Sequence, residues 1–298
     1  MTPPETIGST LGAVAAALRD AGFDEPRRRA RRLLATALGL SASEVFAQIG
    51  RMVTEDDGER VAEILARAVV HEPLSRIVGV REFWGLDFML SPDTLDPRPE
   101  SETIVEAVLA RLTDRDHAYR VLDLGTGTGC LLLSLLSELP AATGIGVDVA
   151  AGAVETARRN AARFGLTARA EFVVGDWAGG MVEAFDVVVA NPPYIASADI
   201  PDLPREVRDF DPRRALDGGA DGLDAYRVIA GELPRLLRPG GVFAGEFGQG
   251  QEEKVAGLIA IRGLSVAEIV RDLAGIPRCV VARRACSEKM VGTAEPHA

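Results

Sequence analysis

Hydrophobic positions recur at helical spacing over the first quarter of the chain. From about residue 9 to residue 70, Ala, Leu and Val return every three or four positions. Gly, Pro and polar residues interrupt the pattern near 22–26, 39–43 and 50–57. At two of these breaks a hydroxyl residue stands three positions before an acid, in Ser41–Glu44 and Thr54–Asp57, which is typical of a helix N-terminus. The pattern predicts a small helical domain over residues 1–74.

Residues 75–96 carry a different pattern. Short alternating runs at 76–83 and 86–90 flank Trp84-Gly85. Alternation with a period of two is typical of strands, and a short Gly-containing connection between two such runs is typical of a tight turn. The segment is therefore predicted to be a β-hairpin that links the helical domain to the rest of the chain.

Two prolines, Pro97 and Pro99, stiffen the chain after the hairpin. A helix is expected from about Ser101 to Leu112. Glu100 and Glu102 stand at its start, where the helix dipole favours negative charge. We expect these two carboxylates to cap the helix.

From Tyr119 on, strand-like and helical runs alternate. The strand-like runs are 119–125, 143–149, 170–176, 185–191, 236–248, 263–271 and 277–283. Helices are expected at 129–139, 151–164 and 251–261, and another after a loop that ends near Gly222. Apolar strands separated by helices predict a parallel sheet that is covered on both faces, in a Rossmann-like α/β domain. The domain is expected to span residues 97–285, and residues 286–298 are expected to be a disordered tail.

Composition narrows the class of protein. Hydrophobic residues make up 47% of the chain, and no apolar run approaches the roughly 20 residues that cross a bilayer. A net charge of -11 disfavours a protein whose main task is to hold a long nucleic acid, because that task needs a concentrated basic face. The arginine-rich stretch 27–32 is expected to be a solvated helix face. No signal peptide or membrane span is expected, so the predicted location is cytoplasmic.

The three cysteines and three histidines are scattered along the chain. None of them stands in the spacing of a metal site, and no Cys-x-x-Cys pair occurs. Neither a disulfide framework nor a Ser-His-Asp triad has the residues it needs. No metal is expected.

A glycine-rich turn follows the first strand of the alternating region. Its candidate ligand-binding residues are Gly125, Thr126, Gly127, Thr128 and Gly129. Because the glycines lack a Cβ, backbone N–H groups of the turn can approach a ligand closely. The same kind of turn also serves as a plain strand-to-helix connection or as a dinucleotide site. Here Asp123 precedes the glycines, and an acid at that position would repel phosphate and suit a cationic ligand.

Acidic residues also end the next two strands. Asp148 lies about 20 residues past the glycines, where a carboxylate can accept from both ribose hydroxyls of a nucleoside. Asp176 could accept from an adenine amino group, and Trp177 could cover the face of the ring. Ligands of open α/β sheets bind at the carboxyl ends of the strands, so the three strand ends together predict a nucleoside site.

With these motifs the chain resembles class I S-adenosylmethionine methyltransferases, through DLGTGTG, GVDV, GDW and LLRPGG. The resemblance implies a seven-stranded Rossmann-like domain with S-adenosylmethionine as the methyl donor and S-adenosylhomocysteine as the product. Such a donor is already activated, so the reaction demands neither a metal nor a strong general base.

The fourth strand runs into Asn191-Pro192-Pro193-Tyr194, a motif of enzymes that methylate a nitrogen on a planar sp2 carbon. The lone pair of such a nitrogen is delocalised, so its N–H bonds must be held to face the methyl group. Asn191 offers a side-chain oxygen and Pro192 a carbonyl as the two acceptors. The prolines keep the turn rigid, and Tyr194 is expected to stack on the planar group.

Further segments narrow the resemblance to the release factor glutamine N5-methyltransferase (HemK-type) family. These segments are GVREFWGLDF, LDPRPESE, NPPYI and RDFDPRRALDGGADGLDAYR, and the resemblance covers nearly the whole chain. It implies methylation of the glutamine in the GGQ motif of peptide chain release factors, which the N-terminal helical domain would help to grip. It also implies that Asn191, Pro192, Pro193 and Tyr194 hold the glutamine, and that the glycine turn, Asp148, Trp177 and Asn191 contact S-adenosylmethionine.

Two other functions are compatible with parts of the pattern. NPPY-type loops also occur in RNA and DNA methyltransferases that act on exocyclic amino groups of bases. A non-catalytic nucleoside-binding adaptor would need only the cofactor loops. An acidic chain without a DNA target-recognition domain fits a protein substrate better than a duplex, so no stable binding of nucleic acid and no membrane partner is expected.

Overall fold

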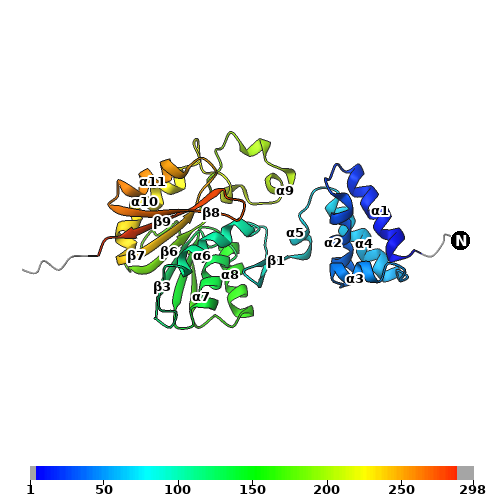
Figure 1. Ribbon diagram of the computed structural model, residues 1–298, viewed down its shortest axis with the longest axis horizontal. Coiled ribbons are helices and arrows are strands. Elements are labelled where there is room, and N and C mark those ends of the chain that lie inside the picture. Colours follow the sequence, from blue (N-terminus) through cyan, green and yellow to red (C-terminus); the bar gives the residue numbers. More distant parts are fainter. Residues whose placement is uncertain (1–4, 287–298) are drawn as a thin grey trace, which may run out of the picture. The chain divides into compact units, whose positions relative to one another are not determined.

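The computed structural model describes residues 5–286, which form two compact units (Figure 1). The first unit runs to Arg81 and also includes Pro204–Phe210, and the second comprises Glu82–Leu203 and the chain from Asp211 on. The helical unit thus extends beyond residue 74 and takes in a distant segment that no pattern in the sequence indicates. Of the expected tail 286–298, all but residue 286 lies outside the described residues.

The first unit is helical, as predicted. Its helices are α1 (Ile7–Asp20), α2 (Pro26–Leu38), α3 (Ala42–Ala47), α4 (Glu55–Ala68), α5 (Leu74–Val78) and α9 (Arg205–Arg208). The predicted helix starts are confirmed, because the hydroxyl of Ser41 accepts from the N–H of Glu44 while the Glu44 carboxylate accepts from the N–H of Ser41. Thr54 and Asp57 form the same reciprocal cap on α4. Apolar side chains of α1, α2, α3 and α4 share one core.

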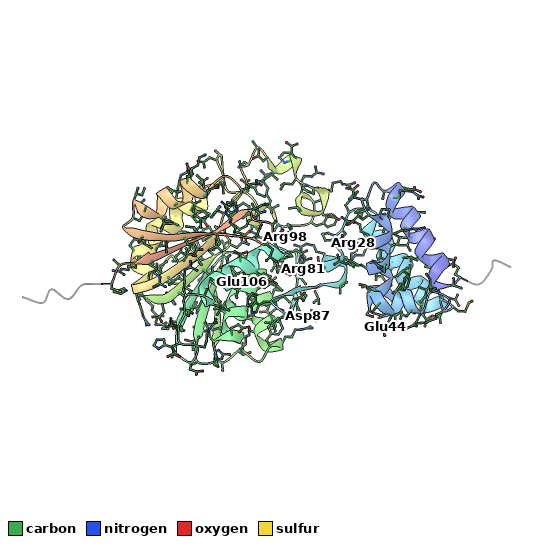
Figure 2. All side chains as sticks on the ribbon, viewed as in Figure 1. Arg28, Glu44, Arg81, Asp87, Arg98 and Glu106 are labelled. Carbon is green, nitrogen blue, oxygen red and sulfur yellow. The ribbon has the colours of Figure 1, made fainter. Side chains whose placement is uncertain are left out.

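The arginines of α2 form an exposed face, as expected. Arg28 (labelled in Figure 2) pairs with Glu25 one turn before it, and both side chains are exposed. Arg29 lies over the ring of Phe23 at 4.8 Å from its centroid and reaches Glu206 of α9 at 2.6 Å. This ion pair helps to explain why residues 204–210 belong to the helical unit.

The predicted hairpin is present but shorter at its start. The strands are β1 (Val80–Phe83) and β2 (Leu86–Met89), and residues 74–78 form α5 instead of strand. Pro73 precedes α5 with a fixed φ of -60°, and Gly79 ends it in the left-handed region at a φ of 76°. The turn between the strands places Trp84 and Gly85 at φ values of 53° and 69°, as a tight hairpin turn with both central residues left-handed requires.

The second unit is built on one seven-stranded sheet in the order β5-β4-β3-β6-β7-β9-β8 (Figure 1). The strands are β3 (Arg120–Leu124), β4 (Thr143–Asp148), β5 (Ala170–Val174), β6 (Phe185–Ala190), β7 (Leu237–Glu246), β8 (Leu264–Arg271) and β9 (Pro277–Arg284). The first five of these pair in parallel. The chain order reverses between β3 and β6, so their carboxyl ends form the topological switch point.

Helices cover both faces of the sheet, as the apolar strands predicted. On one face lie α6 (Glu102–Leu109), α7 (Cys130–Glu138) and α8 (Ala151–Arg163), and on the other lie α10 (Asp224–Leu236) and α11 (Glu252–Ala260). A 3-10 turn, Pro99–Ser101, precedes α6, so the helix expected from about Ser101 to Leu112 is shorter at both ends. The sheet is not wholly parallel, because β9 runs antiparallel to both β7 and β8. A short turn joins β8 to β9, and such a turn can connect only antiparallel neighbours.

Asn160 of α8 ties the hairpin to the glycine turn. It is fully buried, its Oδ1 accepts from the N–H of Met89 at 2.8 Å, and its Nδ2 donates to the carbonyls of Met89 and Thr128 at 3.2 and 2.9 Å. One side chain thereby satisfies three backbone groups, that of Thr128 buried and those of Met89 partly buried, from two segments far apart in the chain.

Asn160→Ala is expected to lower the free energy of unfolding of the sheet unit by about 2–4 kcal/mol, because it removes the partners of one buried and two partly buried backbone groups. Urea unfolding followed by tryptophan fluorescence measures this, since Trp84 and Trp177 both belong to that unit. The matched control is Thr156→Ala, whose buried hydroxyl donates to the Gly152 carbonyl of the same helix, and it should cost about 1 kcal/mol. Equal losses in the two variants would contradict the role of Asn160.

Candidate active site

A cavity of about 160 Å³ lies at the carboxyl ends of the parallel strands, within the sheet unit. Its lining includes ten of the predicted site residues, namely Gly125, Thr126, Gly127, Thr128, Asp148, Asp176, Trp177, Asn191, Pro192 and Pro193. Gly129 and Tyr194, also predicted, do not line it. The cavity therefore brings the predicted nucleoside site and the amide-holding loop together in one space.

Backbone geometry explains the three glycines of the turn. Gly125, Gly127 and Gly129 have φ values of 75°, 53° and 80°, a region that side chains with a Cβ rarely adopt. Gly129 caps α7, and a Cβ there would meet Ala157 and Phe172 at 3.3 Å. Its role is thus to let the turn pack against the domain, while Gly125 and Gly127 line the cavity.

Asp148 holds the glycine turn in place. One carboxylate oxygen accepts from the N–H of Gly127 at 2.9 Å and the other from the N–H of Ala150 at 2.9 Å. Each oxygen retains a lone pair for a second donor. Asp148 can therefore fix the turn and still accept from two hydroxyl groups in the cavity.

Asp123, whose charge was expected to suit a cationic ligand, lies behind the turn. It is fully buried, accepts from the hydroxyl of Thr126 at 2.7 Å and is not part of the cavity lining. Burial raises the pKa of Asp123 to about 7, with the hydrogen bond from Thr126 opposing that effect. The carboxyl group supports the turn from inside the protein.

Trp177 lies beside the glycine turn, in the left-handed region at a φ of 48°. Its Cζ3 is 3.8 Å from the position that a Cβ on Gly125 would occupy. The indole therefore forms one wall of the cavity, as a group that covers an aromatic ring would. Asp176 is exposed at the rim and makes no hydrogen bond through its side chain among residues 5–286.

The Asn191-Pro192 pair offers two acceptors to the cavity. The Asn191 Nδ2 donates to Ser101 Oγ at 2.9 Å, whereas its Oδ1 accepts no hydrogen bond within the described chain. Within the same residues, no hydrogen bond reaches the carbonyl of Pro192. Both oxygens are therefore without a donor within the described chain, and their role as acceptors for an amide stays a prediction.

Tyr194 occupies a different place from the one predicted. Its hydroxyl donates to Glu246 Oε1 at 3.0 Å, and its carbonyl accepts from Gln251 Nε2 at 2.9 Å. Burial, reinforced by the nearby Glu246, raises the pKa of the Tyr194 hydroxyl, which therefore stays protonated. Tyr194 does not line the cavity, so the geometry does not support stacking of its ring on the target amide.

Two polar residues of the site escaped the sequence analysis. Ser101 lines the cavity and donates to Glu246 Oε2 at 2.5 Å, and Glu246 ends β7 with 2% of its surface exposed. Glu102, which was expected to cap the helix, accepts from the N–H of Trp84 at 2.8 Å instead. The available signal was the lone acid in the apolar run VFAGEF, because a buried carboxylate requires partners.

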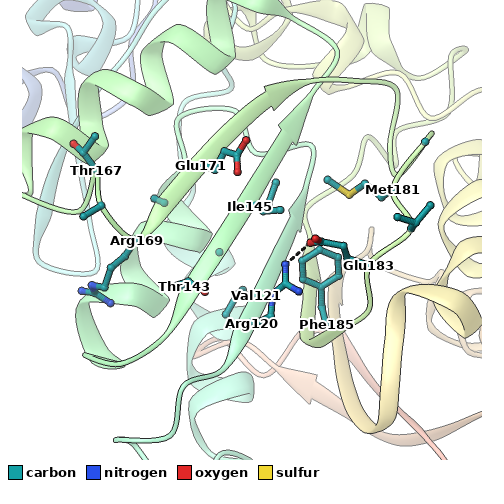
Figure 3. Close-up of a pocket in the computed structure, with 15 residues that line it drawn as sticks. Arg120, Val121, Thr143, Ile145, Thr167, Arg169, Glu171, Met181, Glu183 and Phe185 are labelled. Carbon is teal, nitrogen blue, oxygen red and sulfur yellow. Dashed lines mark hydrogen bonds and ion pairs between the residues drawn. The ribbon is translucent and has the colours of Figure 1, made fainter.

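A larger hollow of about 640 Å³ lies at the opposite end of the strands, around Arg120, Thr143, Ala170 and Phe185 (Figure 3). Its arginines already have partners. Arg120 pairs with Glu183, and Arg169 donates to carbonyl groups at 2.9 to 3.0 Å. None of the predicted site residues lines it, so the smaller cavity is the candidate active site.

Comparison with known proteins identifies the family. Residues 115–256 match the family model of a methyltransferase domain, and residues 10–79 match that of the PrmC N-terminal domain. The release factor glutamine methyltransferase of Rhodospirillum rubrum is 52% identical over 278 residues, 93% of this chain and 85% of the relative. That of Bradyrhizobium diazoefficiens is 44% identical over 94% of this chain and 95% of the relative. The chain belongs to the release factor glutamine methyltransferase family.

The fold is also that of known methyltransferases. A crystal structure of a methyltransferase from Pyrococcus furiosus superposes with a TM-score of 0.50 and 20% identity, and the match covers 76% of this chain and 99% of that one. The predicted Rossmann-like fold and the predicted family are thus confirmed, while the roles of individual site residues stay predictions. No helix among residues 5–286 is long and apolar enough to cross a membrane. Among the same residues, no three His, Cys, Asp or Glu side chains lie close enough together to hold a metal ion.

Two segments that marked the family resemblance meet at the cavity. Arg98 of the PRPESE segment (labelled in Figure 2) pairs with Asp211 of the DPRR segment at 2.5 Å. Asp211 also accepts from the N–H of Asp96 at 3.2 Å. Asp93, shortly before the first of these segments, and Arg214 of the second both line the cavity and form another ion pair. The ion pairs hold together two loops that the sequence separates by more than a hundred residues.

Arg98→Ala is expected to destabilise the sheet unit by about 2–4 kcal/mol, because it removes the guanidinium from a carboxylate whose side chain is 1% exposed. Since the Arg98 side chain is 31% exposed, the loss should not exceed this range. Urea unfolding followed by tryptophan fluorescence gives the value. Arg163→Ala, which removes an exposed ion pair with Asp87, is the control and should change the stability by less than about 0.5 kcal/mol. A loss as small in Arg98→Ala would show that the buried pair contributes nothing.

Proposed function

We propose that this protein transfers a methyl group from S-adenosylmethionine to the side-chain amide nitrogen (N5) of the glutamine in the GGQ motif of peptide chain release factors. The observation that carries the proposal is the pair of free acceptors, Asn191 Oδ1 and the Pro192 carbonyl, in the same cavity as Asp148 and Trp177. The family to which the chain belongs supports a glutamine amide as the acceptor of the methyl group. We further propose that the enzyme acts in the cytoplasm, where translation ends, without stable binding to nucleic acid or membrane.

The lining of the cavity fits S-adenosylmethionine. Asp148 has unused lone pairs for two ribose hydroxyls, and the indole of Trp177 offers a flat apolar wall to an adenine ring. The exposed carboxylate of Asp176 at the rim is available to an adenine amino group. When bound, the cofactor supplies a methyl group activated by its sulfonium.

The residues of the loop position the target nitrogen. A primary amide carries two N–H donors, and the loop offers two oxygen acceptors at fixed places. Holding both N–H bonds sets the plane of the amide and hence the direction of the nitrogen lone pair. Because the two prolines fix the backbone, little reorganisation is needed at the moment of transfer. Most of the rate enhancement is then expected to come from orientation.

The substrate is tested by incubating the protein with S-adenosylmethionine labelled in the methyl group. Separate reactions contain a release factor, its GGQ→GGA variant, tRNA, rRNA and duplex DNA. The proposal predicts label in the release factor and none in the GGA variant. Label in a nucleic acid instead would favour a base N-methyltransferase, and label in no reaction would favour the non-catalytic adaptor.

Asn191→Ala is expected to lower kcat for the release factor by about 100-fold or more, because the target amide loses one of its two acceptors. Calorimetry should find the affinity for S-adenosylmethionine within about threefold of wild type, since Asp148 and Trp177 remain. If cofactor affinity collapses while turnover at saturation is unchanged, Asn191 serves the cofactor and not the amide.

A further inference from the structure

A continuous line of hydrogen bonds leads from the cavity into the protein interior. Asn191 Nδ2 donates to Ser101 Oγ at 2.9 Å, and Ser101 Oγ donates to Glu246 Oε2 at 2.5 Å. Ser101 and Glu246 are each 2% exposed. These hydrogen bonds connect the loop after β6, the start of α6 and the end of β7, which are far apart in the sequence.

Glu246 receives hydrogen bonds on both of its oxygens. Ser101 donates to Oε2, and Tyr194 donates to Oε1 at 3.0 Å. Burial raises the pKa of Glu246, and this effect is opposed by the hydrogen bonds from Ser101 and Tyr194 and by the charge of Arg278. Because both oxygens of Glu246 accept a hydroxyl hydrogen bond, Glu246 determines the direction in which the protons of Ser101 and Tyr194 point.

That direction carries through to Asn191. A serine hydroxyl has one proton, and in Ser101 that proton is committed to Glu246. Ser101 can then offer Asn191 only a lone pair, and the atom of the amide that must face it is Nδ2. The Oδ1 atom is consequently turned toward the cavity, where it can accept from a substrate N–H group. A flipped amide would place two donors against the two donors of the target nitrogen.

We propose that Ser101 is a positioning residue that, anchored by Glu246, fixes the Asn191 amide with its oxygen toward the target nitrogen. The inference rests on the proposed function, because it concerns the amide that Asn191 would hold. Ser101 acts through Asn191, and Glu246 acts through Ser101. Loss of either residue allows the Asn191 amide to rotate or flip, which lowers the fraction of enzyme that can align the substrate.

The experiment measures kcat and KM for methylation of a release factor, together with the affinity for S-adenosylmethionine by calorimetry. The variants are Ser101→Ala, Ser101→Thr and Glu246→Gln, the last of which keeps the size of the side chain but adds a donor. Ser101→Ala and Glu246→Gln should each lower kcat by about 10- to 100-fold with cofactor affinity within about threefold of wild type. Ser101→Thr, which keeps the hydroxyl, should recover most of the activity.

Ser134→Ala is the matched control. Ser134 of α7 is fully buried, and its hydroxyl makes no hydrogen bond among the described residues, so removal of this buried hydroxyl should leave kcat near wild type. Urea unfolding confirms that each variant is folded at the assay temperature.

The outcomes separate this inference from the proposed function. If wild type fails to methylate the release factor, the proposed function is wrong. If wild type is active and either Ser101→Ala or Glu246→Gln keeps its kcat, the positioning role is overturned. Parallel losses of kcat and cofactor affinity would also overturn it, because they indicate a general structural defect. Loss of kcat alone, with recovery in Ser101→Thr, supports it.

Discussion

The parallel pairing of β3 with β6 is the constraint on which the site depends. Leu124 and Ala190, the last residues of the two strands, lie opposite each other, so the glycine turn and the Asn191 loop begin side by side. β4 and β7 pair with the outer edges of these strands, and a slip of β3 against β6 would break hydrogen bonds on both sides. The sheet therefore fixes the distance between the part of the cavity suited to a nucleoside and the part suited to an amide.

Residues whose function depends on local backbone geometry could be predicted from the sequence. The three glycines of the turn are glycines because the turn requires left-handed φ angles, and a regular spacing reveals that need. Asp148 and Trp177 could be placed because strands that alternate with helices bring their carboxyl ends to one edge. Asn191 and Pro192 end a strand of the same kind. In each case the neighbouring residues along the chain carried the information.

Residues whose contacts lie far along the chain were placed differently from the prediction, or were missed. From its own segment, Tyr194 was expected to stack on the target amide. Its hydroxyl instead donates to Glu246, which lies 52 positions further along the chain. Asp123 was expected to suit a cationic ligand, yet it is fully buried behind the turn, where it accepts from Thr126. The antiparallel β9 and the grouping of residues 204–210 with the helical unit likewise depend on partners far along the chain. The pattern of residues within one segment does not show which distant segment it will contact.

The polar groups of the site fall into an outer set that faces the cavity and an inner set that orients it. The outer set consists of acceptors with unused lone pairs, on Asp148, Asn191 and Pro192. The inner set is centred on Glu246, which is 2% exposed. Burying a carboxylate is costly unless hydrogen-bond donors replace the water that it loses. Tyr194 and Ser101 provide that compensation, and the same hydrogen bonds fix the directions of the hydroxyl protons. Methyl transfer from an activated donor depends on orientation more than on a base. A buried group that accepts two hydrogen bonds, as Glu246 does, can set the donor and acceptor directions along a chain of hydrogen bonds as far as the Asn191 amide at the cavity.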